Sequence, residues 1–165
     1  MSPPVPAHLY LGEQIGRNVF RADCVLLGRT VAVKYFRPEQ ADIVASLHRF
    51  VREVHLMGRL DHRNIIRLHD VGHIDDWHYV VMEFVVGVTL QDRLSDDLEH
   101  GRAVGFDLQL RDVLQYTHSL GIKPTHLSPD NVLVDADDTI KVLTSAWKDF
   151  EILEQRSPIW TIPRW

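Results

Sequence analysis

The chain has 165 residues, with 18 basic and 23 acidic side chains, one cysteine and a formal net charge of −5 at pH 7. This length suits one domain or two small lobes, and the ordinary share of apolar residues excludes wholesale disorder. The interspersed charge offers no basic surface for nucleic acid or an anionic membrane, and the longest apolar run, residues 79–88, is too short to span a bilayer. A lone cysteine excludes an internal disulfide, so we expect a cytoplasmic protein.

The first part of the chain is predicted to form an extended arm, two strands and a helix. Prolines at positions 3, 4 and 6 indicate an extended arm over residues 1–7. Residues 19–27 and 30–36 are rich in β-branched and aromatic side chains and predict two strands. Residues 41–60 predict a helix, because apolar residues recur every three or four positions. That apolar stripe consists of Ile43, Leu47, Phe50, Val54 and Met57.

The middle of the chain predicts a strand pair followed by a second helix. Residues 65–71 and 78–86 have the composition of strands, with an acidic turn between them. Residues 91–101 are polar and show no clear periodicity. Residues 106–120 predict a helix that ends at a glycine.

The last part of the chain predicts a small hairpin and an extended tail. Residues 131–134 and 139–143 read as two short strands around an acidic turn, and residues 157–165 are rich in proline and tryptophan. The order of strands, helix, strands, helix and hairpin predicts an α+β fold with a boundary near Gly87.

Three segments of the first half resemble parts of a protein kinase domain. Residues 31–34 match the strand that presents a phosphate-binding lysine, and alternation places Ala32 and Lys34 on one face. Glu53 lies on the predicted helix where active kinases pair a glutamate with this lysine. Met82 matches the gatekeeper position that precedes the hinge between the lobes.

The resemblance extends into the second half and implies the domain organisation. Residues 125–134 resemble the catalytic loop and its following strand, and residues 158–164 resemble the segment that ends in Ala-Pro-Glu. We therefore expect a small β-rich N-lobe with one long helix over residues 8–86. Residues 87–165 are expected to form a truncated helical C-lobe with a degenerate catalytic loop, a β-hairpin and a shortened activation-like segment.

The departures from the family pattern fall on the catalytic positions. The degenerate positions are Pro124, His126, Ser128 and Thr144, which replace a histidine, the catalytic aspartate, a lysine and the magnesium-binding aspartate of the family. Asn131, a magnesium ligand in the family, is kept. A threonine hydroxyl does not replace a carboxylate as a ligand for a hard dication, so most of the catalysis should be lost. We expect no catalytic residue and no metal site.

The nucleotide pocket is only partly preserved in the sequence. Residues 15–20 keep a single glycine of the glycine-rich loop, so few backbone amides remain to contact phosphate. Three apolar residues that would enclose an adenine survive, and ordinary core packing explains them equally well. The residues expected around a nucleotide are Val19, Ala32, Lys34, Glu53, Met82, Asn131 and Leu133.

Four histidines recur every seven residues and raise the question of a metal site. They are His48, His55, His62 and His69. The first two lie on the solvent side of the predicted helix, and the others follow its end. With one cysteine and no carboxylate cluster, surface histidines are the better interpretation.

The sequence also predicts an apolar helix face that another segment or another chain should bury. In the family, the helix over residues 106–120 is packed by helices that follow the Ala-Pro-Glu segment, and the sequence ends near that place. We therefore expect a homodimer or a protein partner to cover this face, with a folded-back tail as the alternative. The residues expected there are Leu110, Val113, Leu114, Trp160 and Trp165.

These patterns favour one functional hypothesis and leave three open. The favoured hypothesis is a catalytically inactive kinase-like domain that regulates or binds a protein and requires no cofactor. One alternative is a divergent serine/threonine kinase with weak transfer that uses Lys34, Glu53 and Asn131. A second is a sensor that binds ATP without magnesium, and a third is a product with no selected role.

Overall fold

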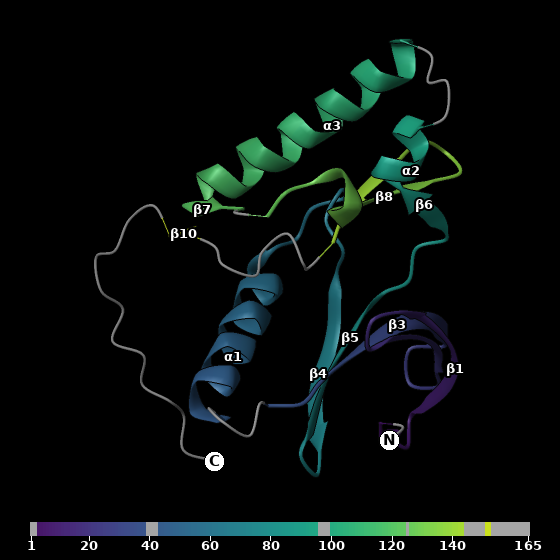
Figure 1. The fold of residues 1–165 in the computed structure, drawn as a ribbon, viewed down its shortest axis with the longest axis vertical. Coiled ribbons are helices and arrows are strands. Elements are labelled where there is room, and N and C mark those ends of the chain that lie inside the picture. The colour runs from purple at the N-terminus through teal and green to yellow at the C-terminus, as the bar shows by residue number, and fades with distance from the viewer. Residues whose placement is uncertain (1–2, 39–42, 96–99, 125, 144–150, 153–165) are drawn as a thin grey trace.

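The structure is a computed structural model that describes residues 3–38, 43–95, 100–124, 126–143 and 151–152. A five-stranded sheet and the helix α1 (Ile43–Arg59) form one end of the molecule, and the helix α3 (His100–Ser119) lies over smaller sheets at the other end (Figure 1). This is the α+β architecture that the element order predicts.

The large sheet is antiparallel and has the strand order β1-β2-β3-β5-β4. Its strands are β1 (Leu9–Gly16), β2 (Val19–Cys24), β3 (Arg29–Phe36), β4 (Leu68–Ile74) and β5 (Trp77–Glu83). The turns between neighbouring strands use Asn18, Gly28 and Asp75, whose φ angles are +58°, +59° and +50°. Glycine, asparagine and aspartate tolerate this left-handed conformation, which explains their place at the turns.

The helix α1 uses most of its predicted apolar stripe. Met57 is buried, and Leu47, Phe50 and Val54 are half-buried. The Phe50 ring stacks on Phe36 of β3 at a centroid distance of 5.2 Å, which fixes the helix against the sheet. Ile43 is 44% exposed, so its assignment to the buried stripe is wrong. It is the first residue of the helix and lies at the end farthest from the buried Leu56 and Met57.

The other end of the molecule begins with a short strand and a helix, which the polar sequence pattern did not predict. The strand β6 (Gly87–Thr89) leads directly into α2 (Leu90–Ser95). The Thr89 hydroxyl accepts a hydrogen bond from the backbone N–H of Asp92 at 3.0 Å, which caps the helix. The expectation of an unpatterned segment over residues 91–101 is therefore wrong for its first half.

The helix α3 begins six residues before the predicted start, at His100. Gly101 and Gly105 lower the helix propensity of this first part, which explains why the sequence pattern begins only at Phe106. Val113 is fully buried in the core of the chain, so its assignment to a partner-binding face is wrong. Leu110 and Leu114 are half-buried, whereas Trp160 and Trp165 lie outside the described residues.

Short strands complete this end. The strand β6 pairs with β8 (Val132–Asp135), which pairs with β9 (Ile140–Val142). A separate pair joins β7 (Ile122–Lys123) to β10 (Glu151–Ile152). A 3₁₀ turn, η1 (Pro129–Asn131), precedes β8.

Two large apolar clusters form the core. One cluster joins the end of α1 and the following loop to α3, β8 and β9, and includes Leu56, Ile65, Val113, Val132 and Ile140. The other lies on one face of the large sheet and includes Leu9, Val31, Val33, Tyr35 and Val81. Because the first cluster draws on both ends of the molecule, burial of its side chains holds them together.

A buried hydrogen-bond network connects the loop after α1 to the far end. Asn64 is 1% exposed, and its Nδ2 donates to Oε1 of Gln109 at 2.8 Å and to the Ile140 carbonyl at 2.9 Å. The Ile140 N–H donates to the same Gln109 oxygen at 3.0 Å. Each of these polar groups is satisfied by another element, so the network fixes the loop to α3 and β9.

The histidines divide into two groups. His48 and His55 are exposed, as the helical wheel predicts. The His62 side chain is only 13% exposed, and its ring accepts the Asn64 N–H at 3.1 Å and lies 3.2 Å from an Asp112 oxygen. His69 of β4 is half-buried, with its Nε2 atom buried, so the interpretation as a surface histidine is wrong for both. Within the described ranges, no cluster of three or more histidine, cysteine or acidic residues could hold a metal ion. None of the helices described is long and apolar enough to cross a membrane.

Candidate functional site

The lysine of β3 and the glutamate of α1 meet beside the large sheet. Lys34 Nζ lies 3.1 Å from Oε1 of Glu53, and the two side chains are 27% and 20% exposed. Alternation along β3 directs Lys34 to the face opposite that of Val33, which is buried in the sheet cluster. The ion pair expected from the sequence is therefore present.

Apolar residues gather on the same face of the sheet. Ala32 and Met82 are paired in register across β3 and β5, are 6% and 7% exposed, and form a cluster with Ile66. Val19 packs against this cluster, as does Leu143, which follows β9. Three of the expected pocket residues, Val19, Ala32 and Met82, are thus brought together, and Leu143 joins them although the sequence pattern did not predict it.

Leu133 lies on a different element from the other expected pocket residues. It is half-buried in the middle of β8, between Val132 and Val134, which are buried in the core shared with α3. Because side chains alternate along a strand, Leu133 lies on the opposite face of β8 from that core. Its register partner on β9 is Lys141, which shares this face.

A second ion pair joins the large sheet at one end of the molecule to the small sheet at the other. Lys141 Nζ lies 2.6 Å from Oε1 of Glu83 at the end of β5, and the side chains are 17% and 28% exposed. The other Glu83 oxygen accepts the backbone N–H of Arg67 at 3.2 Å. The sequence analysis missed this pair. A charged residue between the apolar Ile140 and Val142 was the signal, because alternation directs it away from the core.

The glycine-rich loop is a tight hairpin turn. Gly16 pairs with Val19, so only Arg17 and Asn18 connect β1 to β2. The Asn18 carbonyl accepts the Tyr35 N–H at 2.8 Å, which ties the turn to β3. Few amides are therefore available to contact phosphate, as the shortened motif predicts.

Asn131 organises the loop that resembles a catalytic loop. Its Nδ2 donates to the His126 carbonyl at 2.8 Å and to Oγ of Ser128 at 3.1 Å. Its own carbonyl accepts the Leu143 N–H at 2.8 Å, which attaches the loop to the strand end beyond β9. His126 is exposed and Pro124 is half-buried, whereas Thr144 lies outside the described residues.

The donor set fits one part of an ATP molecule and not another. The apolar cluster around Ala32 and Met82 suits a flat purine, and Lys34 supplies a cation beside it. A magnesium ion requires hard oxygen ligands, which the family provides from an aspartate and an asparagine. The sequence has Thr144 where that aspartate would be and keeps only Asn131, so the residues do not fit the magnesium–triphosphate part.

These features together define a class of protein. A five-stranded antiparallel sheet, a helix whose glutamate pairs with the β3 lysine, and an asparagine-held loop before a short hairpin are the arrangement of a protein-kinase-like domain. Residues 11–150 match the family model described as a protein kinase domain. The chain belongs to the protein kinase family.

Similar proteins agree with this assignment. The chain is 35% identical over 137 residues to a Lactococcus lactis protein named probable serine/threonine-protein kinase PknB, covering 79% of this chain and 22% of that protein. It is 34% identical over 127 residues to serine/threonine-protein kinase PrkC of Bacillus subtilis, covering 76% and 20%. A rice relative, CBL-interacting protein kinase 30, is 34% identical over 138 residues, covering 80% and 29%. The chain spans about a fifth of the two bacterial relatives' lengths.

Proposed function

We propose that this kinase-family domain does not transfer phosphoryl groups and acts as a regulatory, protein-binding module. The observation that carries the proposal is the residue at the catalytic base position, where an exposed imidazole, His126, replaces a carboxylate. Ser128 replaces the lysine that follows in the family, and the sequence has Thr144 at the second aspartate position.

The chemistry of phosphoryl transfer supports this reading. The reaction depends on cations that neutralise the charge developing on the transferred group, and magnesium supplies most of that effect. An imidazole acting as a base contributes only about 10²- to 10⁴-fold, so His126 does not compensate for a lost metal site. The Lys34–Glu53 ion pair then serves to fix α1 against the sheet.

A transfer assay tests the proposal directly. The full chain is incubated with γ-labelled ATP, magnesium or manganese and a general acceptor protein, in parallel with Lys34→Ala. We expect no incorporation above the background of the variant. Incorporation by the natural chain that Lys34→Ala abolishes would overturn the proposal and favour a divergent serine/threonine kinase.

A second candidate function is the binding of ATP without magnesium. The cluster of Val19, Ala32 and Met82 beside Lys34 favours it, because these groups can enclose a purine and pair one phosphate. At a hundredfold excess over its dissociation constant, ATP should stabilise the fold by about 2.7 kcal/mol. The shift in melting temperature should be equal with and without magnesium and absent in Lys34→Ala. No shift at millimolar ATP would exclude this function.

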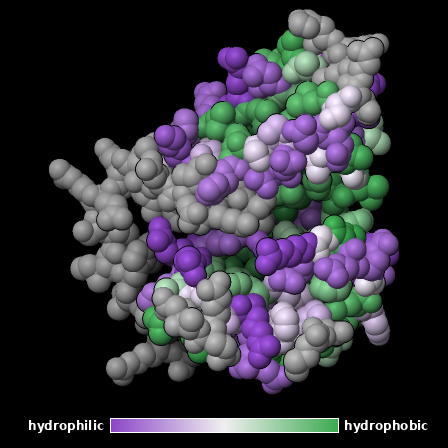
Figure 2. Space-filling view, in the orientation of Figure 1, coloured by the Kyte–Doolittle hydropathy of each residue, from purple (hydrophilic) through white to green (hydrophobic). Residues whose placement is uncertain are grey.

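The protein-binding surface that we propose lies on α3. Val104 and Leu108 are 49% and 61% exposed there, and hydrophobic surface is visible among hydrophilic residues at the α3 end of the molecule (Figure 2). Leu110 and Leu114 are half-buried on the same helix, and Leu110 packs against the core shared with β8 and β9. A homodimer or a protein partner would remove this apolar surface from water.

Sedimentation equilibrium at tens of micromolar tests the homodimer, and a pull-down under the same conditions tests a partner. Leu108→Glu should weaken association in whichever measurement detects it. Leu26→Glu is the matched control, because Leu26 is 77% exposed in the turn between β2 and β3, on a different element. A monomer with no co-purifying protein, or equal effects of the two variants, would contradict the α3 surface.

A further inference from the structure

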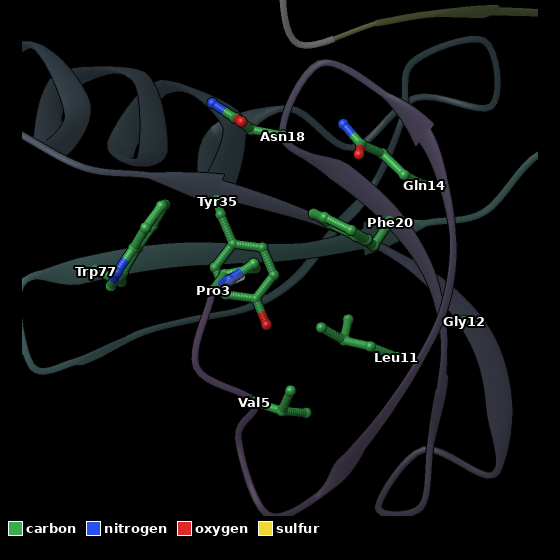
Figure 3. Close-up of a pocket in the computed structure, with 9 residues that line it drawn as sticks. All are labelled: Pro3, Val5, Leu11, Gly12, Gln14, Asn18, Phe20, Tyr35 and Trp77. Carbon is green, nitrogen blue, oxygen red and sulfur yellow. The ribbon is translucent and has the colours of Figure 1, made fainter. Parts of the chain in front are cut away.

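A cavity of about 450 Å³ lies on the other face of the large sheet from Lys34. Its aromatic walls are Phe20, Tyr35 and Trp77, which come from β2, β3 and β5 (Figure 3). Pro3 and Val5 of the N-terminal arm also line it, and Val5 lies near Leu11 of β1 in Figure 3. Alternation separates it from the nucleotide-facing side, because Tyr35 and Lys34 are neighbours on β3 and point to opposite faces.

The aromatic walls are held in fixed orientations. The Tyr35 and Phe20 rings meet edge to face at a centroid distance of 5.9 Å, and the Tyr35 and Trp77 rings meet at 6.3 Å in the same manner. Tyr35 is 2% exposed, so its ring has little freedom to move. The three rings are therefore held in place. The Tyr35 hydroxyl is covered, so a ligand atom reaches it only when a neighbouring side chain of the lining turns aside.

One polar group beside this cavity has no partner among the residues that the structure describes. The Tyr35 hydroxyl is buried and makes no hydrogen bond, and it points into the space between Val5 and Leu11 (Figure 3). Burial, with a further contribution from Tyr79, raises the pKa of Tyr35 to about 12, so the hydroxyl keeps its proton at neutral pH. A buried, unpaired hydroxyl is unfavourable, and an acceptor atom of a ligand would satisfy it.

The lining also indicates the charge of an occupant. The lining residues that the structure describes are uncharged, with Gln14 and Asn18 supplying polar side chains besides Tyr35. The volume lies within the range of about 300–1,000 Å³ that is typical of small-molecule sites. An ionised ligand would lose its hydration without gaining a counter-charge from these residues, so a neutral one is favoured.

We propose that this cavity binds a small neutral aromatic molecule whose oxygen accepts a hydrogen bond from the Tyr35 hydroxyl. The aromatic part lies against Phe20 and Trp77, and the acceptor oxygen lies between Val5 and Leu11. This site is independent of ATP binding, since the two ligands would occupy opposite faces of the sheet.

The test uses 2-naphthamide as the probe and the full, ¹⁵N-labelled chain. Titration followed by NMR should shift the Trp77 indole signal and the Gly12 amide signal. The anion 2-naphthoate, which has the same rings, should not bind. Tyr35→Phe should weaken 2-naphthamide binding by about 2- to 12-fold, the effect expected for one hydrogen bond. Tyr10→Phe is the matched control, because Tyr10 is 69% exposed on β1, and it should bind as the natural chain does.

Three outcomes would overturn the proposal. They are no shifts with 2-naphthamide, equal binding of 2-naphthoate, and unchanged affinity in Tyr35→Phe. Millimolar ATP should not displace the probe, and displacement would assign it to the nucleotide face instead. The comparison of amide and carboxylate uses only the natural chain, so it stands even if a variant folds poorly. Failure of the transfer or ATP experiments would leave these results unaffected.

Discussion

The Lys34–Glu53 pair is partly exposed, which limits what it adds to stability. Water screens the attraction between groups that are 27% and 20% exposed, and holding both side chains costs entropy. Glu53→Gln should therefore lower the free energy of unfolding by only about 0–1 kcal/mol, measured by urea denaturation. Glu13→Gln, on an exposed part of β1, is the control and should be neutral. A loss well above this range would contradict the small contribution expected of a screened ion pair.

Site residues could be predicted from the sequence where strand alternation or helix periodicity marks them. Lys34 and Glu53 were found because strand alternation and helix periodicity place each of them on a definite face. Glu83 was missed because its partner Lys141 is distant in sequence and reaches it only when β9 lies beside the end of β5. His62 was misjudged for the same reason, since its partner Asp112 belongs to α3. Contacts between distant elements leave little trace in local periodicity.

Replacing either of two glycines by alanine should change the free energy of unfolding, in opposite directions. Gly105 lies inside α3, and an added Cβ would meet nothing within 4 Å. Gly105→Ala should raise the free energy of unfolding by about 0.5–1 kcal/mol, because alanine is the better helix former. Gly87 of β6 is different, since a Cβ there would collide with the Val134 carbonyl of β8. Gly87→Ala should lower the free energy of unfolding by about 1–3 kcal/mol.

Thermal or urea unfolding of the two variants beside the natural chain measures both effects. Equal effects of the two substitutions would contradict the difference in space. A stabilised Gly87→Ala would show that β6 and β8 can separate at little cost.

Helices and strands with a clear composition and periodicity were predicted from the sequence. Short or exposed elements, which depend on contacts with other parts of the chain, were not. The strands over residues 19–27 and 30–36 and the helix over 41–60 were identified because composition and periodicity agree. The strand β1 was not assigned, because its residues are mostly exposed and give no clear alternation. The helix α2 was missed, because its six residues are too few for a periodic pattern and its start depends on the Thr89 cap.

The stability of the whole molecule should depend on histidine protonation. Burial lowers the pKa of His69 and of His78 below the ordinary value of 6.5, and nearby Arg29 and His73 add to the respective effects. In the unfolded chain both histidines take up protons near pH 6.5, whereas in the folded chain they do so only at lower pH. The unfolded state therefore binds more protons as the pH falls below 6.5, and the free energy of unfolding should decrease.

Urea denaturation at about pH 7 and about pH 5.5 measures this dependence over the range in which histidines titrate. Carboxylates also contribute at acid pH, so the informative quantity is the difference between the natural chain and His69→Gln/His78→Asn. The double variant should lose less stability between the two pH values. An identical loss in both proteins would contradict the role of these histidines.

The order of strands in the large sheet has a consequence for how the chain folds. The strands β3 and β5 are neighbours, yet α1 and β4 lie between them in the sequence. The hairpins β1–β2–β3 and β4–β5 can form from adjacent residues within microseconds, whereas the central pairing must first close a long loop. We expect that closure to be the slow kinetic step. In stopped-flow refolding, Val81→Ala at the β3–β5 seam should slow folding. Ile74→Ala should slow it as well, because the β4–β5 hairpin forms before that closure, and a variant that only speeds unfolding would contradict this order.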